Sequence, residues 1–479
     1  MTRVDTPQTR CRAAFAQADI TPPAGIYHRM WGAALHEVAT GVHRPLTATA
    51  MLVEALDGTS RLLVLGIDHC LLEAVETNAI KARVRSVSGI APEQVHIALS
   101  HTHGSAWLSR SRAHLPGGDL IGPYLDSVAE TCANLAKEVV GKLQPATIVY
   151  GQSRCSLAAH RDFWDEATKQ IVCGFNPTGP ADDTVTLAKV IAEPLAGSRV
   201  LGTIVNYACH PTTLAWENTL VSPDYVGAMR EVVERETNAP CLFLQGASGE
   251  LGPREGYVGD TAVADRNGRQ LGFAALSGLE AMPPAGTFFE YAGPVVSGAT
   301  LGSWKHRPLS EAEKTQQQRF ASKRFTTPLP YRVDLPTVEE TKAELAKWEA
   351  AEAAANDDVG VRDAHAHVER MNRQLARLDT LPEGTSYPFP VGIWLLGNSL
   401  WIFTAGEQYQ TFQTTLRERF PNLAVMVSTI TDDWQPGYLP PASSYGYGIY
   451  QEVIAAVGPG ALESLIETVA REATALFAE

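Results

Sequence analysis

Short apolar runs that end at turn residues recur along the chain, and such runs are typical of buried β-strands. Two of them, 47–56 and 61–68, flank an Asp57-Gly58 pair, which predicts a β-hairpin. The runs that predict strands are 14–20, 47–56, 61–68, 95–99, 147–153, 184–191, 200–207, 240–244, 391–396, 400–404 and 425–430.

Apolar residues at helical spacing predict helices between these strands. The sequence Ser222-Pro223-Asp224 combines a cap, a proline at the first helical position and an acidic residue in the first turn, so it predicts a helix start. The helices predicted in this way cover 71–87, 124–143, 223–237 and 460–477.

Residues 309–378 differ from the rest of the chain because they are charged and rich in Ala, Glu and Lys. Helical spacing at 338–355 and 361–378 predicts a helical excursion packed on the main domain. Together with the strands, this pattern predicts an α/β fold with mixed β-sheets flanked by helices. We expect one catalytic domain over residues 1–479.

Charge and composition narrow the class of partner. The formal net charge of −14 argues against nucleic acid and anionic membrane surfaces. No apolar run reaches the length of a membrane span, and no apolar segment of a signal peptide follows the polar N-terminus. The seven cysteines lack CxxC spacing, which favours reduced thiols and a cytoplasmic location. We expect a small-molecule substrate, and a homo-oligomer is compatible with the sequence.

Polar side chains follow several predicted strands directly, where ligands bind in open α/β sheets. The pair His101 and His103 comes after 95–99, and two imidazoles with a carboxylate and a phenolate form a four-coordinate zinc site. Each residue also has a structural interpretation, since His210 can cap a turn, Glu407 can be a solvated loop acid and Tyr438 can be a packing residue. The candidate metal ligands are His101, His210, Glu407 and Tyr438.

Several short motifs, in order along the chain, resemble the neutral/alkaline ceramidase family of zinc amidases. They are Ala18-Asp19-Ile20-Thr21-Pro22, Ser100-His101-Thr102-His103, Cys209-His210-Pro211, Gly406-Glu407 and Tyr438-Leu439-Pro440. The resemblance implies that His101, His210, Glu407 and Tyr438 bind Zn²⁺ and that His103 lies over the substrate. It also implies catalytic roles for Arg161 and Tyr450 and a substrate contact for Tyr445.

The sequence departs from the family pattern at two points. The run Gly249-Glu250-Leu251-Gly252-Pro253 places Gly252 where ceramidases carry a serine proposed as nucleophile. The chain also leaves no room for the family's C-terminal immunoglobulin-like domain, so we expect the catalytic domain only.

The resemblance implies a zinc-dependent hydrolase that cleaves an amide or ester bond with a metal-activated water. We expect a small polar substrate rather than ceramide, because the loops that carry Arg161, Asp432 and Asp433 offer polar groups that a lipid tail would leave unpaired. Asp433 and Trp434 are further candidate substrate contacts. Three alternatives stay open: a ceramidase proper, a zinc lyase or isomerase acting on a sugar-like substrate, and a non-catalytic binding protein.

Overall fold

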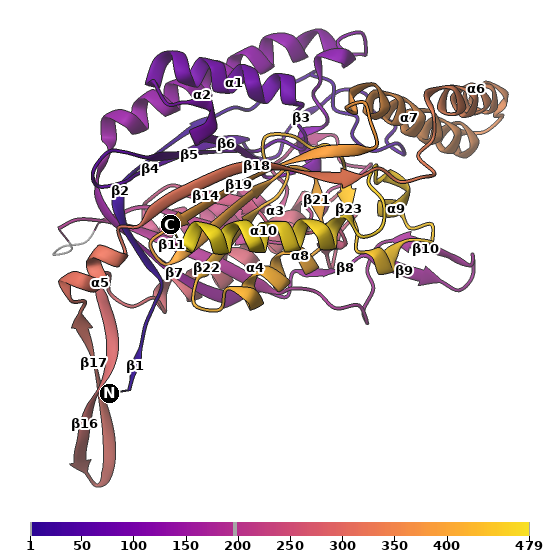
Figure 1. Ribbon diagram of the computed structural model, residues 1–479. Helices are drawn as coiled ribbons and strands as arrows, with labels where there is room; N and C mark the ends of the chain where they lie inside the picture. Colours follow the sequence, from indigo (N-terminus) through magenta and orange to yellow (C-terminus); the bar gives the residue numbers. More distant parts are fainter. Residues whose placement is uncertain (1, 195–198, 479) are drawn as a thin grey trace.

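The computed structural model describes residues 2–194 and 199–478, and an eight-stranded sheet lies at its centre (Figure 1). Its strands are β2 (Gln8–Asp19), β4 (Thr47–Glu54), β5 (Arg61–Ile67), β6 (Val95–Leu99), β7 (Gln144–Arg154), β11 (Thr184–Ala192), β12 (Val200–Tyr207) and β14 (Cys241–Gln245). Their order is β14-β12-β11-β7-β2-β4-β5-β6. The predicted hairpin is present as antiparallel β4 and β5, and Gly58 takes the positive φ of 75° that the turn requires.

A second, four-stranded sheet packs face to face on the first. It has the order β18-β19-β20-β22 and consists of β18 (Phe320–Pro330), β19 (Ser386–Leu396), β20 (Ser399–Thr404) and β22 (Ala424–Ser428). Phe15 and Met51 from the first sheet share one buried cluster with Trp394 and Trp401 from the second. Burial of this apolar layer is the main favourable term that holds the two sheets together.

Helices cover the outer faces of both sheets, so the fold has four layers, helix-sheet-sheet-helix. Helices α1 (Ala74–Ser88) and α2 (Ile121–Lys142) cover β2, β4, β5 and β6, while α3 (Tyr225–Thr237) and α4 (Thr261–Glu280) cover β11, β12 and β14. Helices α8 (Thr411–Arg419) and α10 (Ala461–Ala478) cover the second sheet. The predicted α/β class with mixed sheets flanked by helices is confirmed.

The prediction of a helical excursion over 309–378 is wrong for part of that range. Residues 320–330 form β18, which pairs with β19 along its whole length, and only α6 (Val338–Ala354) and α7 (Asp358–Thr380) form the predicted helix pair. Strand β18 is an edge strand, where Pro328, Pro330 and charged side chains are tolerated, so it lacks the apolar run of a central strand.

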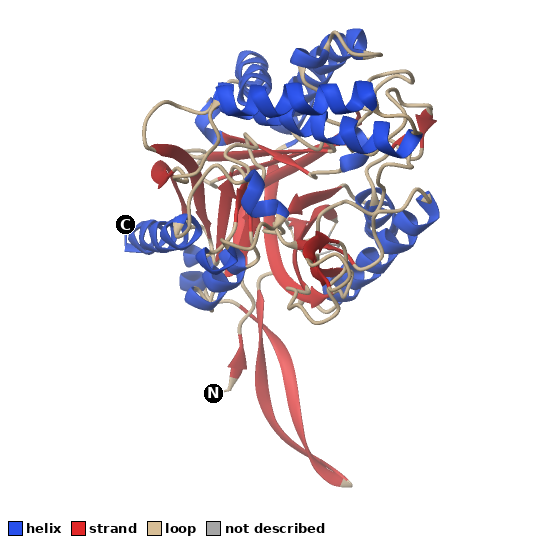
Figure 2. Cartoon of the chain, turned by 90° about the vertical axis from the view of Figure 1, so that its right-hand side faces the viewer, coloured by secondary structure: helices blue, strands red, loops and turns tan. Residues whose placement is uncertain are grey.

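Two further elements lie in a stretch for which the sequence pattern predicted nothing, namely α4 and a long hairpin. The hairpin, β16 (Thr287–Ser297) and β17 (Ala299–Pro308), projects from the body together with β1 (Arg3–Val4) (Figures 1 and 2). Within the described ranges, no helix is both long and apolar enough to cross a bilayer.

The central sheet curls, and this curling brings distant strand ends together. Gly66 on β5 lies close to β14, and a Cβ atom there would collide with Leu242 Cδ1, so the leucine side chain would have to shift. The segments that follow β6 and β12 meet directly, because the His103 N–H donates to the Pro211 carbonyl at 3.3 Å. The two histidine motifs therefore share one site.

Candidate metal centre and its cavity

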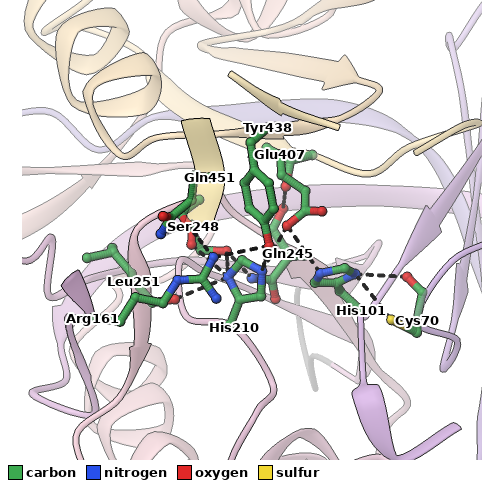
Figure 3. Close-up of polar contacts among 12 residues, drawn as sticks. Cys70, His101, Arg161, His210, Gln245, Ser248, Leu251, Glu407, Tyr438 and Gln451 are labelled. Carbon is green, nitrogen blue, oxygen red and sulfur yellow. Dashed lines mark hydrogen bonds and ion pairs between the residues drawn. The ribbon is translucent and has the colours of Figure 1, made fainter. Parts of the chain in front are cut away.

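His101 lies two residues beyond β6 in a left-handed backbone conformation, with φ 64°. A non-glycine residue rarely adopts this conformation, and such strain clusters at functional sites. The His101 N–H donates to the His69 carbonyl at 2.9 Å, and Nδ1 donates to the Cys70 carbonyl at 2.8 Å. Both contacts orient the buried ring so that Nε2 points away from Cys70, towards Glu407 (Figure 3).

His210 follows β12 and is fully buried. Its Nδ1 donates to the Ser248 carbonyl at 2.7 Å, and its Nε2 lies 2.9 Å from Glu407 Oε2. A histidine whose Nδ1–H is held by a backbone carbonyl keeps the Nε2 lone pair free for a metal. His101 and His210 share this arrangement, with ring centroids 4.8 Å apart.

Glu407 and Tyr438 come from two short strands, β21 (Glu407–Gln408) and β23 (Tyr438–Leu439). These strands pair in parallel, and the register places Glu407 directly opposite Tyr438. Glu407 Oε2 lies 3.4 Å from His101 Nε2, and the Tyr438 hydroxyl lies 3.4 Å from His210 Nε2. Arg161 Nη2 donates to the same hydroxyl at 3.1 Å, so one phenol joins the arginine to the cluster (Figure 3).

This donor set fits a zinc ion. The candidate ligand atoms of His101, His210 and Glu407 lie within 4.8 Å of one another, and His101 Nε2 is a buried atom without a hydrogen-bond partner among the described residues. Burial lowers the pKa of His210 to about 4, which keeps its imidazole neutral. Burial alone would raise the pKa of Glu407, but the two imidazoles hold it well below its ordinary value. Burial lowers the pKa of His101, but Cys70 and Glu407 outweigh that effect and raise it to about 10, so zinc binding would displace a proton from His101.

A second group of potential ligands, Cys70, His101 and His103, shares one histidine with the first. The Cys70 sulfur faces Nδ1 of His101 at 3.8 Å, and the Cys70 carbonyl already accepts the proton on that nitrogen. The geometry therefore favours the group on the Nε2 side of the ring, which contains His210 and Glu407.

A cavity of about 510 Å³ opens onto Tyr438 and His103. Both ring nitrogens of His103 are buried and have no hydrogen-bond partner in the described ranges, and burial holds the pKa of this imidazole well below its ordinary value. The Trp31 ring packs on His103 with a centroid separation of 5.2 Å, and the Tyr450 ring lies 5.7 Å from that of Tyr438. His103 is thus a buried, neutral imidazole that lines the cavity.

The structure brings seven of the ten candidate site residues together. Those that line the cavity or form the cluster are His101, His103, Arg161, His210, Glu407, Tyr438 and Tyr450. Helix α9 (Tyr450–Ile454) presents Tyr450 at the cavity, and Arg161 follows the short strand β8 (Ala158–His160).

The other three candidates do not line the cavity, so their predicted substrate contacts lack structural support. The Tyr445 hydroxyl donates to the Val457 carbonyl at 2.8 Å, and Asp433 accepts from the N–H groups of the two residues that follow it. Trp434 is a core residue that packs on Trp107 at 5.6 Å. Turn and core contacts satisfy these side chains, and a local sequence pattern does not distinguish them from site residues.

Asp432 is likewise a structural residue. It forms an ion pair with Lys81 at 2.8 Å and accepts from the Ile97 N–H at 2.9 Å, so it ties β6 to the second sheet. The prediction that Asp432 and Asp433 offer polar groups to a substrate is therefore wrong. Other polar residues line the cavity instead.

Sequence reasoning missed several lining residues. Thr212 comes directly after the Cys209-His210-Pro211 motif, and its buried hydroxyl has no hydrogen-bond partner within the described part of the chain. Tyr257 and Trp31 pack edge to face at 5.7 Å beside His103. Proximity to a motif could have indicated Thr212, whereas Trp31 carries no local signal because it reaches the cavity from a distant loop.

Gly252, at the position of the family serine, lies beside the cavity wall. A Cβ atom there would have ordinary contacts, the nearest at 3.7 Å from the Thr212 hydroxyl and 3.8 Å from Arg161 Cδ. Backbone crowding therefore does not require glycine at this position.

The fold and the buried cluster define a mixed α/β protein with the neutral ceramidase fold. A neutral ceramidase structure from Pseudomonas aeruginosa matches 98% of this chain and 74% of that chain at 16% identity, with a TM-score of 0.64. A structure described as ceramidase complexed with C2 matches 97% of this chain and 74% of that chain at 15% identity, with a TM-score of 0.63.

Sequence comparison points to the same proteins. A neutral ceramidase from Oryza sativa subsp. japonica is 24% identical over 238 residues, which cover 45% of this chain and 28% of the rice protein. The match thus spans less than a third of that relative's length. No family model matches the chain. The resemblance to neutral ceramidases that the motifs predict is confirmed.

Proposed function

We propose that this chain is a zinc-dependent hydrolase that cleaves an amide or ester bond of a small polar substrate. The observation that carries the proposal is the buried cluster of His101, His210, Glu407 and Tyr438, whose imidazole Nε2 atoms face one carboxylate and whose tyrosine lines a cavity. The likeness to neutral ceramidases supports a hydrolase.

Four residues would hold the ion, namely His101, His210, Glu407 and Tyr438. Zinc in such a site supplies a Lewis acid that polarises a carbonyl and acidifies water. The backbone carbonyls of Cys70 and Ser248 orient the two imidazoles, as the outer contacts of metal ligands commonly do.

His103 is the group that moves protons. Its neutral, unpartnered ring accepts a proton from the attacking water and returns it to the leaving amine or alcohol. Arg161 and Tyr450 line the same cavity and stabilise the negative charge that develops on the carbonyl oxygen. In the balanced reaction, the water oxygen bonds to the carbonyl carbon, the C–N or C–O bond breaks, and the leaving group takes one proton.

Water is the nucleophile in this proposal. Gly252 offers no hydroxyl at the family's serine position, and the nearby Ser248 hydroxyl accepts from Gln245 Nε2 at 2.7 Å. Ser248 also does not line the cavity. We propose a cytoplasmic setting for the reaction, which the spacing of the seven cysteines favours because it is typical of reduced thiols.

Ceramide itself is the second candidate substrate, because the relatives are ceramidases by name. The aromatic rings of Trp31 and Tyr257 offer an apolar surface to an acyl chain. The rest of the cavity wall carries charged side chains, which favour a polar substrate over ceramide.

Zinc analysis followed by a substrate screen tests the proposal. Natively purified protein should contain one zinc per chain and hydrolyse some members of an amide and ester panel, and chelation should abolish turnover. His210→Ala should retain less than about one tenth of the zinc, because it removes one of four ligands. His114→Ala is the matched control, since His114 is exposed and bonds only the Ser111 carbonyl. Full zinc content in His210→Ala would refute the ligand assignment.

A further inference from the structure

One face of helix α7 forms a wall of the cavity and carries positive charge. Arg370, Arg373 and Arg377 are spaced three and four residues apart, which places them on one side of a helix. All three line the cavity together with Arg161 and Glu369 (Figure 1 shows α7 at the end of the sheets where β21 and β23 lie). Four guanidinium groups therefore face one lining carboxylate.

The Glu369 carboxylate already pairs with two arginines of the protein itself. Glu369 accepts from Arg373 at 2.7 Å and from Arg112 at 2.8 Å, so two guanidinium groups share one negative charge. Arg161 bonds the Gly249 carbonyl and the Tyr438 hydroxyl, which are both neutral partners. In the described part of the chain, Arg161, Arg370 and Arg377 have no ion pair with a carboxylate.

Arg377 is the most deeply buried of the helix arginines. Its side chain lies over the Trp434 ring at 5.7 Å and bonds the Gln374 side chain, and its Nε atom is buried with no hydrogen-bond partner among the residues described. Burial lowers the pKa of this guanidinium, because a buried charge without a counter-charge is disfavoured. A bound anion would supply both the missing charge and the missing acceptor.

Helix α7 is held firmly against the site, so this charge is a built feature of the cavity. Arg373 Nη2 donates to the Met30 carbonyl at 2.7 Å, and Gln435 Nε2 donates to the Arg377 carbonyl at 3.3 Å. A Cβ atom at Gly32 would come within 2.9 Å of Ala366 Cβ, so glycine allows the close approach of the helix to the loop below it.

From this arrangement we infer that the substrate carries an oxyanion, a carboxylate or sulfonate, which Arg377 and Arg370 bind while the scissile carbonyl lies at the His101–Glu407 cluster. The inference rests on the proposed hydrolase function and specifies its substrate class. A neutral lipid such as ceramide would leave the buried Arg377 guanidinium without an anionic partner, whereas a planar guanidinium pairs well with an oxyanion.

A matched substrate series tests the inference. The probes are N-acetyl-ω-amino acids with one to five methylene groups between the amide and the carboxylate, each with its sulfonate and neutral carboxamide counterparts. At the best spacing, the zinc-loaded protein should prefer an anion over the carboxamide by about 10- to 100-fold in kcat/KM, since a charged hydrogen bond contributes about 1.5–3 kcal/mol. The carboxylate and sulfonate arms identify the anion.

Two variants and one control test whether Arg377 and Arg370 cause the preference for anions. Arg377→Met should reduce the preference ratio to about one, and Arg370→Gln, an exposed position at the cavity edge that poses little risk to folding, should reduce it several-fold. Arg362→Met is the control, because Arg362 on the same helix pairs with Asp363 outside the cavity and should keep the full ratio. A preference that survives both Arg377→Met and Arg370→Gln would overturn the inference.

Calorimetry separates this inference from the proposed function. Zinc-loaded His103→Ala protein should bind the anionic probes more tightly than the carboxamides, and the double variant with Arg377→Met should not. Absence of turnover for every probe would refute the hydrolase proposal but not this binding result. Equal affinity for anions and carboxamides at every spacing would overturn the inference even if turnover is found.

Discussion

Two sides of the site, the metal cluster at the strand ends and helix α7, differ in how they hold their functional groups. On the sheet side, His101, His210, Glu407 and Tyr438 sit at strand ends, and backbone hydrogen bonds or strand pairing fix each one. On the helix side, α7 presents Arg370, Arg373 and Arg377 through long side chains.

We interpret this difference as a division between catalysis at the metal cluster and selection of the substrate by helix α7. A metal site needs ligand positions accurate to a few tenths of an ångström, which strand ends and carbonyl contacts provide. Recognition of an anion tolerates looser geometry, since charge acts over a longer range. We therefore expect changes on the sheet side to abolish turnover and changes on the helix side to alter substrate preference.

The largest effect should come from His103→Ala on the sheet side. Loss of the proton-transfer group should reduce kcat by about 100- to 10,000-fold while zinc content stays at one per chain. Turnover with a matched anion and carboxamide should fall by the same factor. If kcat were unchanged, or if zinc were lost as well, the separation of proton transfer from metal binding would be wrong.

Glu250 behind the sheet-side wall should make stability depend on pH. Burial raises the pKa of this carboxyl to about 8, above its ordinary value near 4.3, so the folded state binds the proton more tightly. Its contribution to stability is complete below about pH 4 and is lost as pH rises towards 8. The unfolding free energy should fall by about 4–5 kcal/mol over this range through Glu250.

Urea unfolding at pH 5 and pH 8 measures this dependence. Glu250→Gln should remove most of the difference between the two pH values, while Glu418→Gln, at an exposed position on α8, should leave it in place. An equal pH dependence in the wild type and in Glu250→Gln would show that this carboxyl does not titrate as inferred.

On the helix side, Glu369→Gln should change both the stability of the protein and its preference for anionic substrates. The change leaves Arg112 and Arg373 without their shared carboxylate, which should lower the unfolding free energy by about 1–3 kcal/mol. The more positive wall should also raise the preference for anionic probes several-fold. Chemical denaturation and the kcat/KM ratio measure the two effects, and a lower preference for anions would contradict the role given to this wall.

The smallest effect should come from Gly252→Ser. The nearest atom to the added Cβ lies at 3.7 Å, so the serine should fit with little change in folding, zinc content or kcat. Intact-mass measurement during turnover should show no acyl adduct in either protein. A covalent adduct on the new serine, together with faster turnover, would show that the site is built for a serine nucleophile.

The sequence predicted the sheet-side wall much better than the helix side. Strand-end residues such as His101 and His210 follow apolar runs, so periodicity and short motifs locate them. The arginines of α7 look like the solvated face of a charged helix, because Arg370, Arg373 and Arg377 become a cavity wall only when α7 docks on the loop around Gly32.

Tertiary contacts also explain the errors. Trp434 follows a strand just as the site residues do, but its ring packs on Trp107 in the core. Tyr445 keeps the family spacing, yet its hydroxyl is satisfied by the Val457 carbonyl. Strand β18 escaped prediction because its stability comes from β19, which follows it by more than fifty residues.

The central claim concerns which atoms bind zinc, and X-ray absorption at the zinc edge of natively purified protein tests it most directly. We predict a first shell of nitrogen and oxygen atoms at about 2.0–2.1 Å, with the scattering pattern of two imidazoles and without sulfur. A sulfur shell at about 2.3 Å would place the ion at Cys70 with His101 and His103, and would contradict the assignment of His210, Glu407 and Tyr438.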